Sequence, residues 1–140
     1  MTAVFDSSAL LAHFLGEAGG VTVREMLAAA KRQQVRIQMS PINLAEVTNI
    51  VLRRRGGTAL REFLGWLDQL PITIVPADRD LAVAAGTLKY RLGIPYGDCF
   101  AAALAHRLSA EVVTRDPDFE KVQSLVKVVW IGTPRSETER

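Results

Sequence analysis

Cysteine, histidine and long apolar runs are scarce in this chain of 140 residues. The single cysteine, Cys99, excludes an internal disulfide, and no group of cysteines and histidines has the spacing of a zinc site. No uninterrupted apolar run approaches the ~18 residues that span a bilayer, and no basic segment precedes the first apolar stretch. We therefore expect a soluble, cytoplasmic protein with no membrane partner and a buried, inert thiol.

An excess of either charge is also missing. Lysine and arginine number 17 and the acidic residues 15, so the formal net charge is only +2, with a sequence pI near 9.0. This balance permits a polyanionic partner without requiring one. The length is close to the ~150 residues of one domain, and 49% of the residues are hydrophobic, enough for one core. We expect a single domain over residues 1–133 and a polar tail over residues 134–140.

Short β-branched runs alternate with longer helical patterns, which is typical of an α/β fold with a mostly parallel sheet. Five strands are expected, at residues 2–5, 36–39, 72–75, 111–114 and 126–131. Helices are expected at residues 8–16, 21–34, 41–55, 59–70, 79–92 and 96–108, with a short one after Pro117. Ser40 and Pro41 are a favourable N-cap and first helical position, and Gly56 and Gly57 end the same helix.

Four acidic residues occupy unusual positions in this pattern. Asp6 and Asp116 each follow an apolar strand, so they project from the carboxyl ends of strands, where α/β sheets place ligand crevices. Glu46 and Asp98 each lie on an otherwise apolar helical segment. Each acid also has an ordinary structural interpretation. Asp6 and Asp116 could be N-caps, Asp98 could interact with a helix dipole, and Glu46 could be exposed at the edge of a buried stripe.

Taken together, these acids favour a shared pocket at one edge of the sheet. Two carboxylates ~4 Å apart repel by roughly 4 kcal/mol at an effective dielectric constant near 20, so a cluster of four requires cations. Oxygen ligands without histidine or cysteine suit Mg²⁺ or Mn²⁺.

The order and spacing of these acids resemble the PIN-domain nucleases, and among them the VapC-type toxins of bacterial toxin–antitoxin pairs. The resemblance spans nearly the whole chain. It rests on four segments: Asp6-Ser7-Ser8-Ala9-Leu10, Ser40 to Glu46, Tyr96-Gly97-Asp98-Cys99, and Thr114-Arg115-Asp116-Pro117-Asp118-Phe119.

The resemblance implies a three-layer α/β/α PIN-like domain and Mg²⁺- or Mn²⁺-dependent hydrolysis of RNA phosphodiester bonds. It makes four residues the catalytic and metal-binding set, with two hydroxyls in support: Asp6, Glu46, Asp98 and Asp116, supported by Ser8 and Thr114. It also implies a homodimer and a cognate antitoxin as partner. Asp118 could be an outer-shell ligand, although a turn residue is the favoured interpretation.

Basic residues have two interpretations as well. Arg115 is a candidate contact with RNA phosphate or a partner for a carboxylate of the site. The run from Arg53 to Arg55 could bind RNA phosphates, or could stabilise the carboxyl terminus of its helix through the dipole.

Other functions remain as alternatives. A catalytically idle PIN-like module would bind protein or RNA without needing a divalent ion. A phosphatase of the haloacid-dehalogenase type would need a second acid two positions after Asp6, where this chain has Ser8. A receiver-type phosphoacceptor would need a lysine closing the last strand, which here ends in Trp130 and Ile131.

Overall fold

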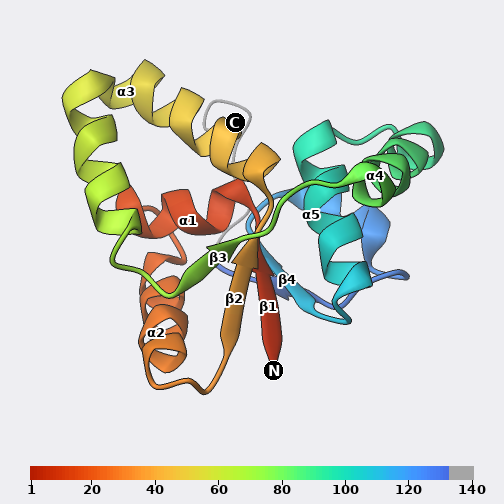
Figure 1. The fold of residues 1–140 in the computed structure, drawn as a ribbon, viewed down its shortest axis with the longest axis horizontal. Helices are drawn as coiled ribbons and strands as arrows, with labels where there is room; N and C mark the ends of the chain where they lie inside the picture. The colour runs from red at the N-terminus through yellow and green to blue at the C-terminus, as the bar shows by residue number, and fades with distance from the viewer. Residues whose placement is uncertain (133–140) are drawn as a thin grey trace.

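A parallel sheet forms the centre of the computed structural model, which describes residues 1–132. Its strands run side by side in the order β3-β2-β1-β4-β5, and every neighbouring pair is parallel. The strands are β1 (Thr2–Phe5), β2 (Arg36–Met39), β3 (Ile72–Ile74), β4 (Glu111–Thr114) and β5 (Val128–Trp130). Figure 1 shows β1 and β2 running side by side from the end of the sheet near the amino terminus toward the start of α3. The predicted α/β class with a five-stranded parallel sheet is confirmed.

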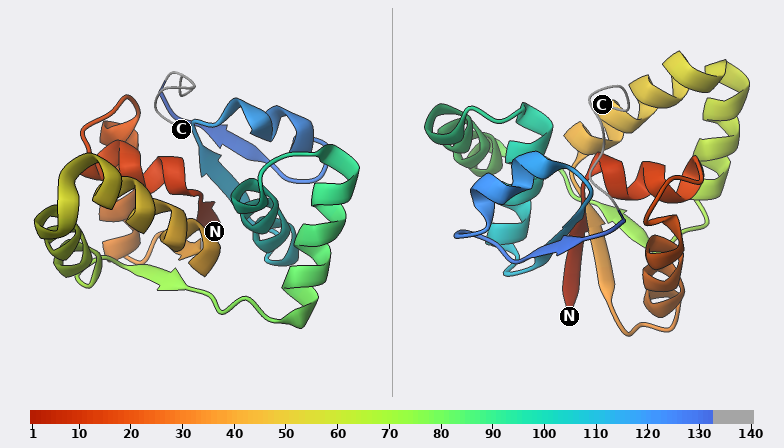
Figure 2. Two further views of the ribbon diagram at one scale, coloured as in Figure 1. Left: turned by 90° about the horizontal axis from the view of Figure 1, so that it is seen from above. Right: turned by 180° about the vertical axis from the view of Figure 1, so that it is seen from behind.

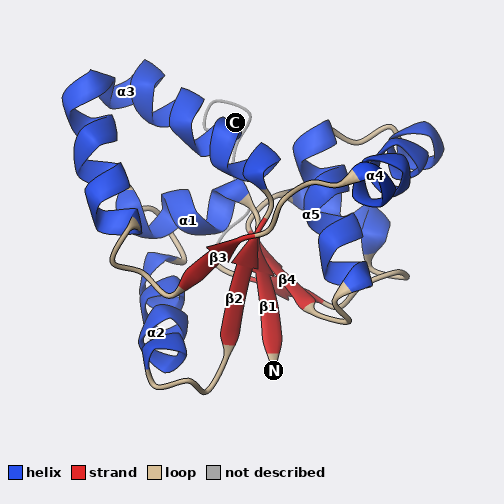
Figure 3. Cartoon of the chain, viewed as in Figure 1, coloured by secondary structure: helices blue, strands red, loops and turns tan. Residues whose placement is uncertain are grey.

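Helices cover both faces of this sheet and make the predicted three-layer arrangement (Figure 2). They are α1 (Ser7–Phe14), α2 (Gly20–Lys31), α3 (Pro41–Leu67), α4 (Arg79–Leu92) and α5 (Tyr96–Arg107), with a 3₁₀ helix, η1 (Pro117–Val122). Figure 3 shows α1, α2 and α3 on one side of the strands and α4 and α5 on the other.

The alternation of side chains along β1 explains the two layers. Val4 packs with Val112 against α4 and α5, whereas Phe5 packs with Val113 against α1 and α2. Successive strand residues point to opposite faces, so both faces of these central strands are apolar and buried.

The long helix α3 consists of two helical parts that meet at a kink, which agrees with the two helices predicted at residues 41–55 and 59–70 except that no loop joins them. Its first part begins as predicted, since the Ser40 hydroxyl accepts a hydrogen bond from the backbone N–H of Ile42 at 3.1 Å and Pro41 follows. The break at Gly56 is also present, with φ 82° and ψ −177°. Helical structure resumes at once after this single glycine, which adopts a left-handed φ at little cost, so no loop separates the two parts.

Strand β5 is shorter than predicted, because only Val128, Val129 and Trp130 pair with β4. The predicted tail, residues 134–140, lies outside the described residues. Within residues 1–132, no helix combines the length and the apolar character needed to cross a membrane.

Candidate metal centre

The predicted acids meet above the carboxyl ends of β1 and β4, between the first turns of α3 and α5. A hollow of about 200 Å³ opens there. Four acidic side chains share its wall with other residues of α1, α3 and the loop before α5: Ser7, Glu46, Asn49, Ile50, Arg53, Pro95, Asp98, Asp116 and Asp118. Three of the predicted acids, Glu46, Asp98 and Asp116, therefore line the hollow together with Asp118, whereas Asp6 is not among its described lining residues.

Asp6 is both the N-cap of α1 and a buried acid at this edge, only 1% exposed. Its Oδ1 accepts hydrogen bonds from the Ser8 hydroxyl at 2.7 Å and from the backbone N–H of Ala9 at 2.9 Å. Its Oδ2 accepts a short hydrogen bond from the Thr114 hydroxyl. The two predicted supporting hydroxyls thus hold both carboxylate oxygens in place.

Asp116 and Asp118 lie on the turn that leaves β4. Asp116 caps η1, since its Oδ1 accepts a hydrogen bond from the backbone N–H of Asp118 at 2.9 Å, as the N-cap interpretation predicted. The turn also brings the Asp118 carboxylate to the cluster. One oxygen from each of Asp98, Asp116 and Asp118 lies within 4.8 Å of the other two. Asp118 thus lies on a turn, as the favoured interpretation predicted, and its carboxylate is also close to those of Asp98 and Asp116.

Glu46 is half-buried and is held by residues that the sequence did not single out. Its Oε1 accepts hydrogen bonds from the Asn43 amide at 3.1 Å and the Ser7 hydroxyl at 3.2 Å. The same Asn43 amide nitrogen also donates to the carbonyl oxygen of Gly97 at 3.1 Å. Asn43 thereby joins the first turn of α3 to the first turn of α5, where Asp98 lies.

Gly97 is required by this contact. A Cβ atom added to Gly97 would overlap the Oε1, Oε2 and Cδ atoms of Glu46, so the carboxylate occupies the space that any other side chain would need. No pattern in the sequence predicts this contact between residues 51 positions apart.

The surroundings of Asp98 oppose its negative charge. Its side chain is buried, with 6% of the residue exposed. Burial raises its pKa to about 9, and the negative charges of Asp116, Asp6, Glu46 and Asp118 contribute in that order. Desolvation and like charges both disfavour the ionised form. The helix dipole, which would favour the ionised form, does not offset these two effects.

The arrangement fits a hard divalent cation. Asp98 Oδ2 is buried and has no hydrogen-bond partner among residues 1–132. Two charges 4.8 Å apart repel by roughly 3.5 kcal/mol at an effective dielectric constant of 20, so three carboxylates at that spacing need a proton or a cation. The donors are carboxylate oxygens, which Mg²⁺ and Mn²⁺ prefer.

Arg115 does not face this hollow. Its side chain is 3% exposed and forms an ion pair with Glu17 at 3.5 Å, while Arg54 pairs with the other oxygen of Glu17 at 3.3 Å. The guanidinium is buried beside Glu17, on the loop between α1 and α2, and the RNA contact of Arg115 stays a prediction. The backbone of Arg115 serves the site, where its N–H donates to the Ser8 hydroxyl at 2.8 Å.

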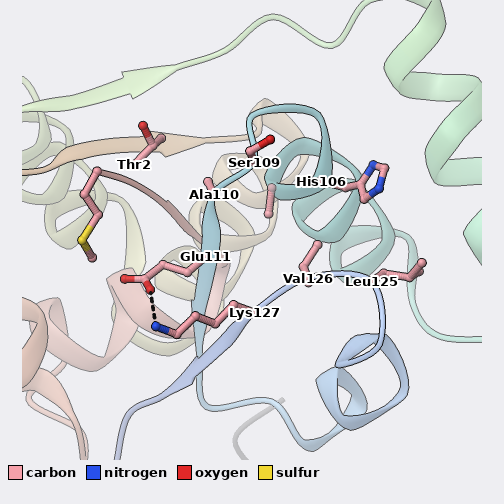
Figure 4. Close-up of a pocket in the computed structure, with 10 residues that line it drawn as sticks. Thr2, His106, Ser109, Ala110, Glu111, Leu125, Val126 and Lys127 are labelled. Atoms are coloured by element: carbon pink, nitrogen blue, oxygen red, sulfur yellow. Dashed lines mark ion pairs between the residues drawn. The ribbon is translucent and has the colours of Figure 1, made fainter.

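A larger hollow, of about 430 Å³, lies at the amino ends of β1 and β4 (Figure 4). Among its described lining residues Glu111 is the one acid, and it pairs with Lys127 at 3.5 Å. The described lining residues of this hollow thus form no group of converging acids.

The comparisons with known proteins agree with this geometry. The family model described as PIN domain matches residues 3–125, which is most of the chain. The chain belongs to the PIN domain family. A curated relative, "Ribonuclease VapC" from Mycolicibacterium smegmatis, is 33% identical over 109 residues, covering 73% of this chain and 81% of the relative.

Solved structures share the PIN-domain fold. A complex described as VapBC2 from Rickettsia felis, bound to a DNA fragment from its promoter, contains a chain with a TM-score of 0.73 and 18% identity. That comparison covers 94% of this chain and 99% of the other. Mycobacterium tuberculosis VapC20, described as a toxin that cleaves the sarcin-ricin loop, has a TM-score of 0.70 and 20% identity, with coverage of 90% and 98%. These likenesses confirm the fold that the sequence predicted.

Proposed function

We propose that this PIN domain is a Mg²⁺- or Mn²⁺-dependent endoribonuclease and the toxin of a toxin–antitoxin pair. The observation that carries the proposal is the convergence of acidic side chains on one hollow. Among them, Asp98 has a buried oxygen with no hydrogen-bond partner in residues 1–132. The ribonuclease names of the curated relatives support RNA as the substrate.

In this proposal the cation is held by Asp6, Glu46, Asp98 and Asp116, and Asp118 joins them. A bound divalent ion supplies a Lewis acid for the phosphodiester and makes hydroxide available near neutral pH. Asp6 and Glu46 are fixed by hydrogen bonds, so they hold their oxygens in position without a conformational search. Asp98 Oδ2 has no hydrogen-bond donor among residues 1–132, so its lone pairs are available to the cation.

Hydrolysis forms a bond from the oxygen of water to phosphorus and breaks one P–O ester bond, leaving a phosphate on one RNA fragment and a hydroxyl on the other. A carboxylate of the cluster accepts the proton of the attacking water, and the leaving oxygen takes up a proton, returned from the cluster or from solvent, to become the hydroxyl. The short distances between the acids make this transfer possible within the hollow.

The partners in the proposal are RNA, a cognate antitoxin and a second copy of the chain. Structural relatives described as VapBC, including one from Mycobacterium tuberculosis described as a member of a toxin-antitoxin family, support an antitoxin partner.

The test is cleavage of a mixed pool of structured RNA by purified protein, free of antitoxin, in Mn²⁺ or Mg²⁺. EDTA and the Asp98→Asn variant should each abolish the cuts. In parallel, Mn²⁺ at a hundredfold excess over its dissociation constant should stabilise the native protein by ~2.7 kcal/mol in thermal unfolding. If the protein neither cuts the RNA nor shows a Mn²⁺-dependent shift in melting temperature, the nuclease proposal is refuted and an idle binding module is favoured.

A further inference from the structure

One cationic side chain shares the acidic hollow. Arg53 lies on α3 seven residues after Glu46, with Asn49 and Ile50 between them, and all four residues line the hollow. Positions i, i+3, i+4 and i+7 fall on one face of a helix, so the face of α3 that carries Glu46 also carries Arg53. At 1.5 Å per residue, the two lie about 10 Å apart along the helix axis.

The three arginines of this run therefore have different surroundings. Arg54 pairs with Glu17 at 3.3 Å, on the side of α3 that faces the loop between α1 and α2. Arg55 is exposed and does not line the hollow. Arg53 is exposed at the hollow and forms no hydrogen bond or ion pair with another residue of the described chain, residues 1–132.

The negative charge of the hollow opposes the entry of a polyanion, and Arg53 can offset part of that repulsion. Glu46, Asp98, Asp116 and Asp118 line it, so a polyanion that enters meets several carboxylates, and Arg53 is the one basic side chain among the described lining residues. A guanidinium binds phosphate through two parallel hydrogen bonds, and an exposed one is free to do so.

We propose that Arg53 binds a phosphate of the RNA backbone next to the scissile phosphate and thereby positions the strand over the acids. This inference rests on the proposed function and adds a specific substrate contact to it. The alternative is that Arg53 only complements the dipole at the end of the first part of α3, since the helix breaks at Gly56. Arg55 lies in the same last turn but does not line the hollow, so a comparison of variants at Arg53 and Arg55 distinguishes phosphate binding from the effect on the helix dipole.

The experiment compares Arg53→Ala, Arg53→Lys and Arg55→Ala with the unmodified protein. Binding of a fluorescein-labelled, mixed-sequence single-stranded RNA is measured by anisotropy in EDTA at several salt concentrations. Cleavage of the RNA pool is measured in Mn²⁺. The Mn²⁺-induced shift in melting temperature reports whether the acid cluster is intact.

Arg53→Ala should weaken RNA binding about tenfold, as expected for loss of a charge-assisted hydrogen bond. It should also reduce the slope of log affinity against log salt by about 0.7, the value for one phosphate on a single strand. Its kcat/KM should fall with the affinity, while the Mn²⁺ shift stays unchanged. Arg53→Lys should recover part of the loss, and Arg55→Ala should stay within about twofold of the unmodified protein.

Equal effects of Arg53→Ala and Arg55→Ala would overturn the inference, because the role would then be general charge or helix stability. The inference would also be overturned if Arg53→Ala bound and cut RNA as well as an unmodified protein that is active in the same assay. That result would leave the nuclease proposal intact. Loss of the Mn²⁺ shift in Arg53→Ala would instead assign Arg53 to the acid cluster. If the unmodified protein neither binds nor cuts RNA, both proposals fail.

Discussion

Gly97→Ala is expected to displace Glu46 from the acidic hollow while leaving the fold intact. The new methyl group would overlap the whole Glu46 carboxylate, whose atoms are the nearest to that position. A carboxylate at the end of a flexible side chain can move away, whereas backbone could not. The expected damage is therefore local: Glu46 loses the Asn43 amide and the Ser7 hydroxyl as hydrogen-bond donors.

The change in stability should be small because two effects oppose each other. Losing two hydrogen bonds whose partners return to water costs about 1–3 kcal/mol in total, at about 0.5–1.5 kcal/mol each. Replacing glycine by alanine within a helix contributes up to ~1 kcal/mol in the other direction. The free energy of unfolding should therefore fall by no more than about 2 kcal/mol. The effect on function should be larger, since disturbing the groups that hold metal ligands typically lowers metal affinity or activity 10–100-fold.

The assay is a Mn²⁺ titration followed by cleavage of the RNA pool, with urea unfolding in EDTA as the measure of stability. Gly86→Ala on α4 is the matched control, because a Cβ there meets no atom within 4 Å. Combining Gly97→Ala with Glu46→Asp, which shortens the acid by one methylene, should restore part of the Mn²⁺ affinity. If Gly97→Ala binds Mn²⁺ and cuts RNA as well as the control does, the position of the Glu46 carboxylate does not matter and the reasoning is refuted.

Three further predictions concern buried charge. Since the folded pKa of Asp98, about 9, lies above the ordinary value of 3.8, the metal-free native state holds an extra proton between these values. Its free energy of unfolding should therefore fall as pH rises, by at most ~1.4 kcal/mol per pH unit. Urea unfolding in EDTA from pH 5 to 8 measures this slope, and a free energy of unfolding that does not change with pH would contradict the prediction. Asp98→Asn should remove that slope and raise metal-free stability at pH 8, whereas a less stable variant would argue against repulsion in the cluster. Glu17→Ala, which removes the carboxylate beside the buried Arg115, should cost about 2–4 kcal/mol in the same assay, with the exposed Glu25→Ala as a near-neutral control.

The fold was predictable where a local pattern and its burial agree. Strands β1, β2 and β4 begin and end as predicted, because each is a short apolar run with a clear boundary and lies inside the sheet. The edge strand β5 was predicted too long, since its length depends on how far β4 extends beside it. The break at Gly56 was predicted from the glycine itself, whereas the immediate return to helix depends on the packing of Phe63 and its neighbours against α1.

The candidate site was also predictable only where a local pattern places the residue. The positions of Asp6 and Asp116 follow from strand ends, which the sequence reveals. The direction of Arg115 does not, because it is set by an ion pair with Glu17, on a loop 98 residues away in the chain. The link from Asn43 to Gly97 is likewise a contact between distant segments, which no local pattern reveals.

The structural and chemical interpretations of these acids are not alternatives. Asp6 caps α1 with the oxygen that also accepts the Ser8 hydroxyl, and Asp116 caps η1 while it lies within the cluster. These caps hold the two carboxylates rigid, so the same hydrogen bonds that begin the helices also position the site. Asp98 is different, because its buried Oδ2 has no donor in residues 1–132 and its charge is opposed by burial and by its neighbours. The fold thus supports Asp6 and Asp116 by itself, and it leaves to a proton or a cation the stabilisation of Asp98.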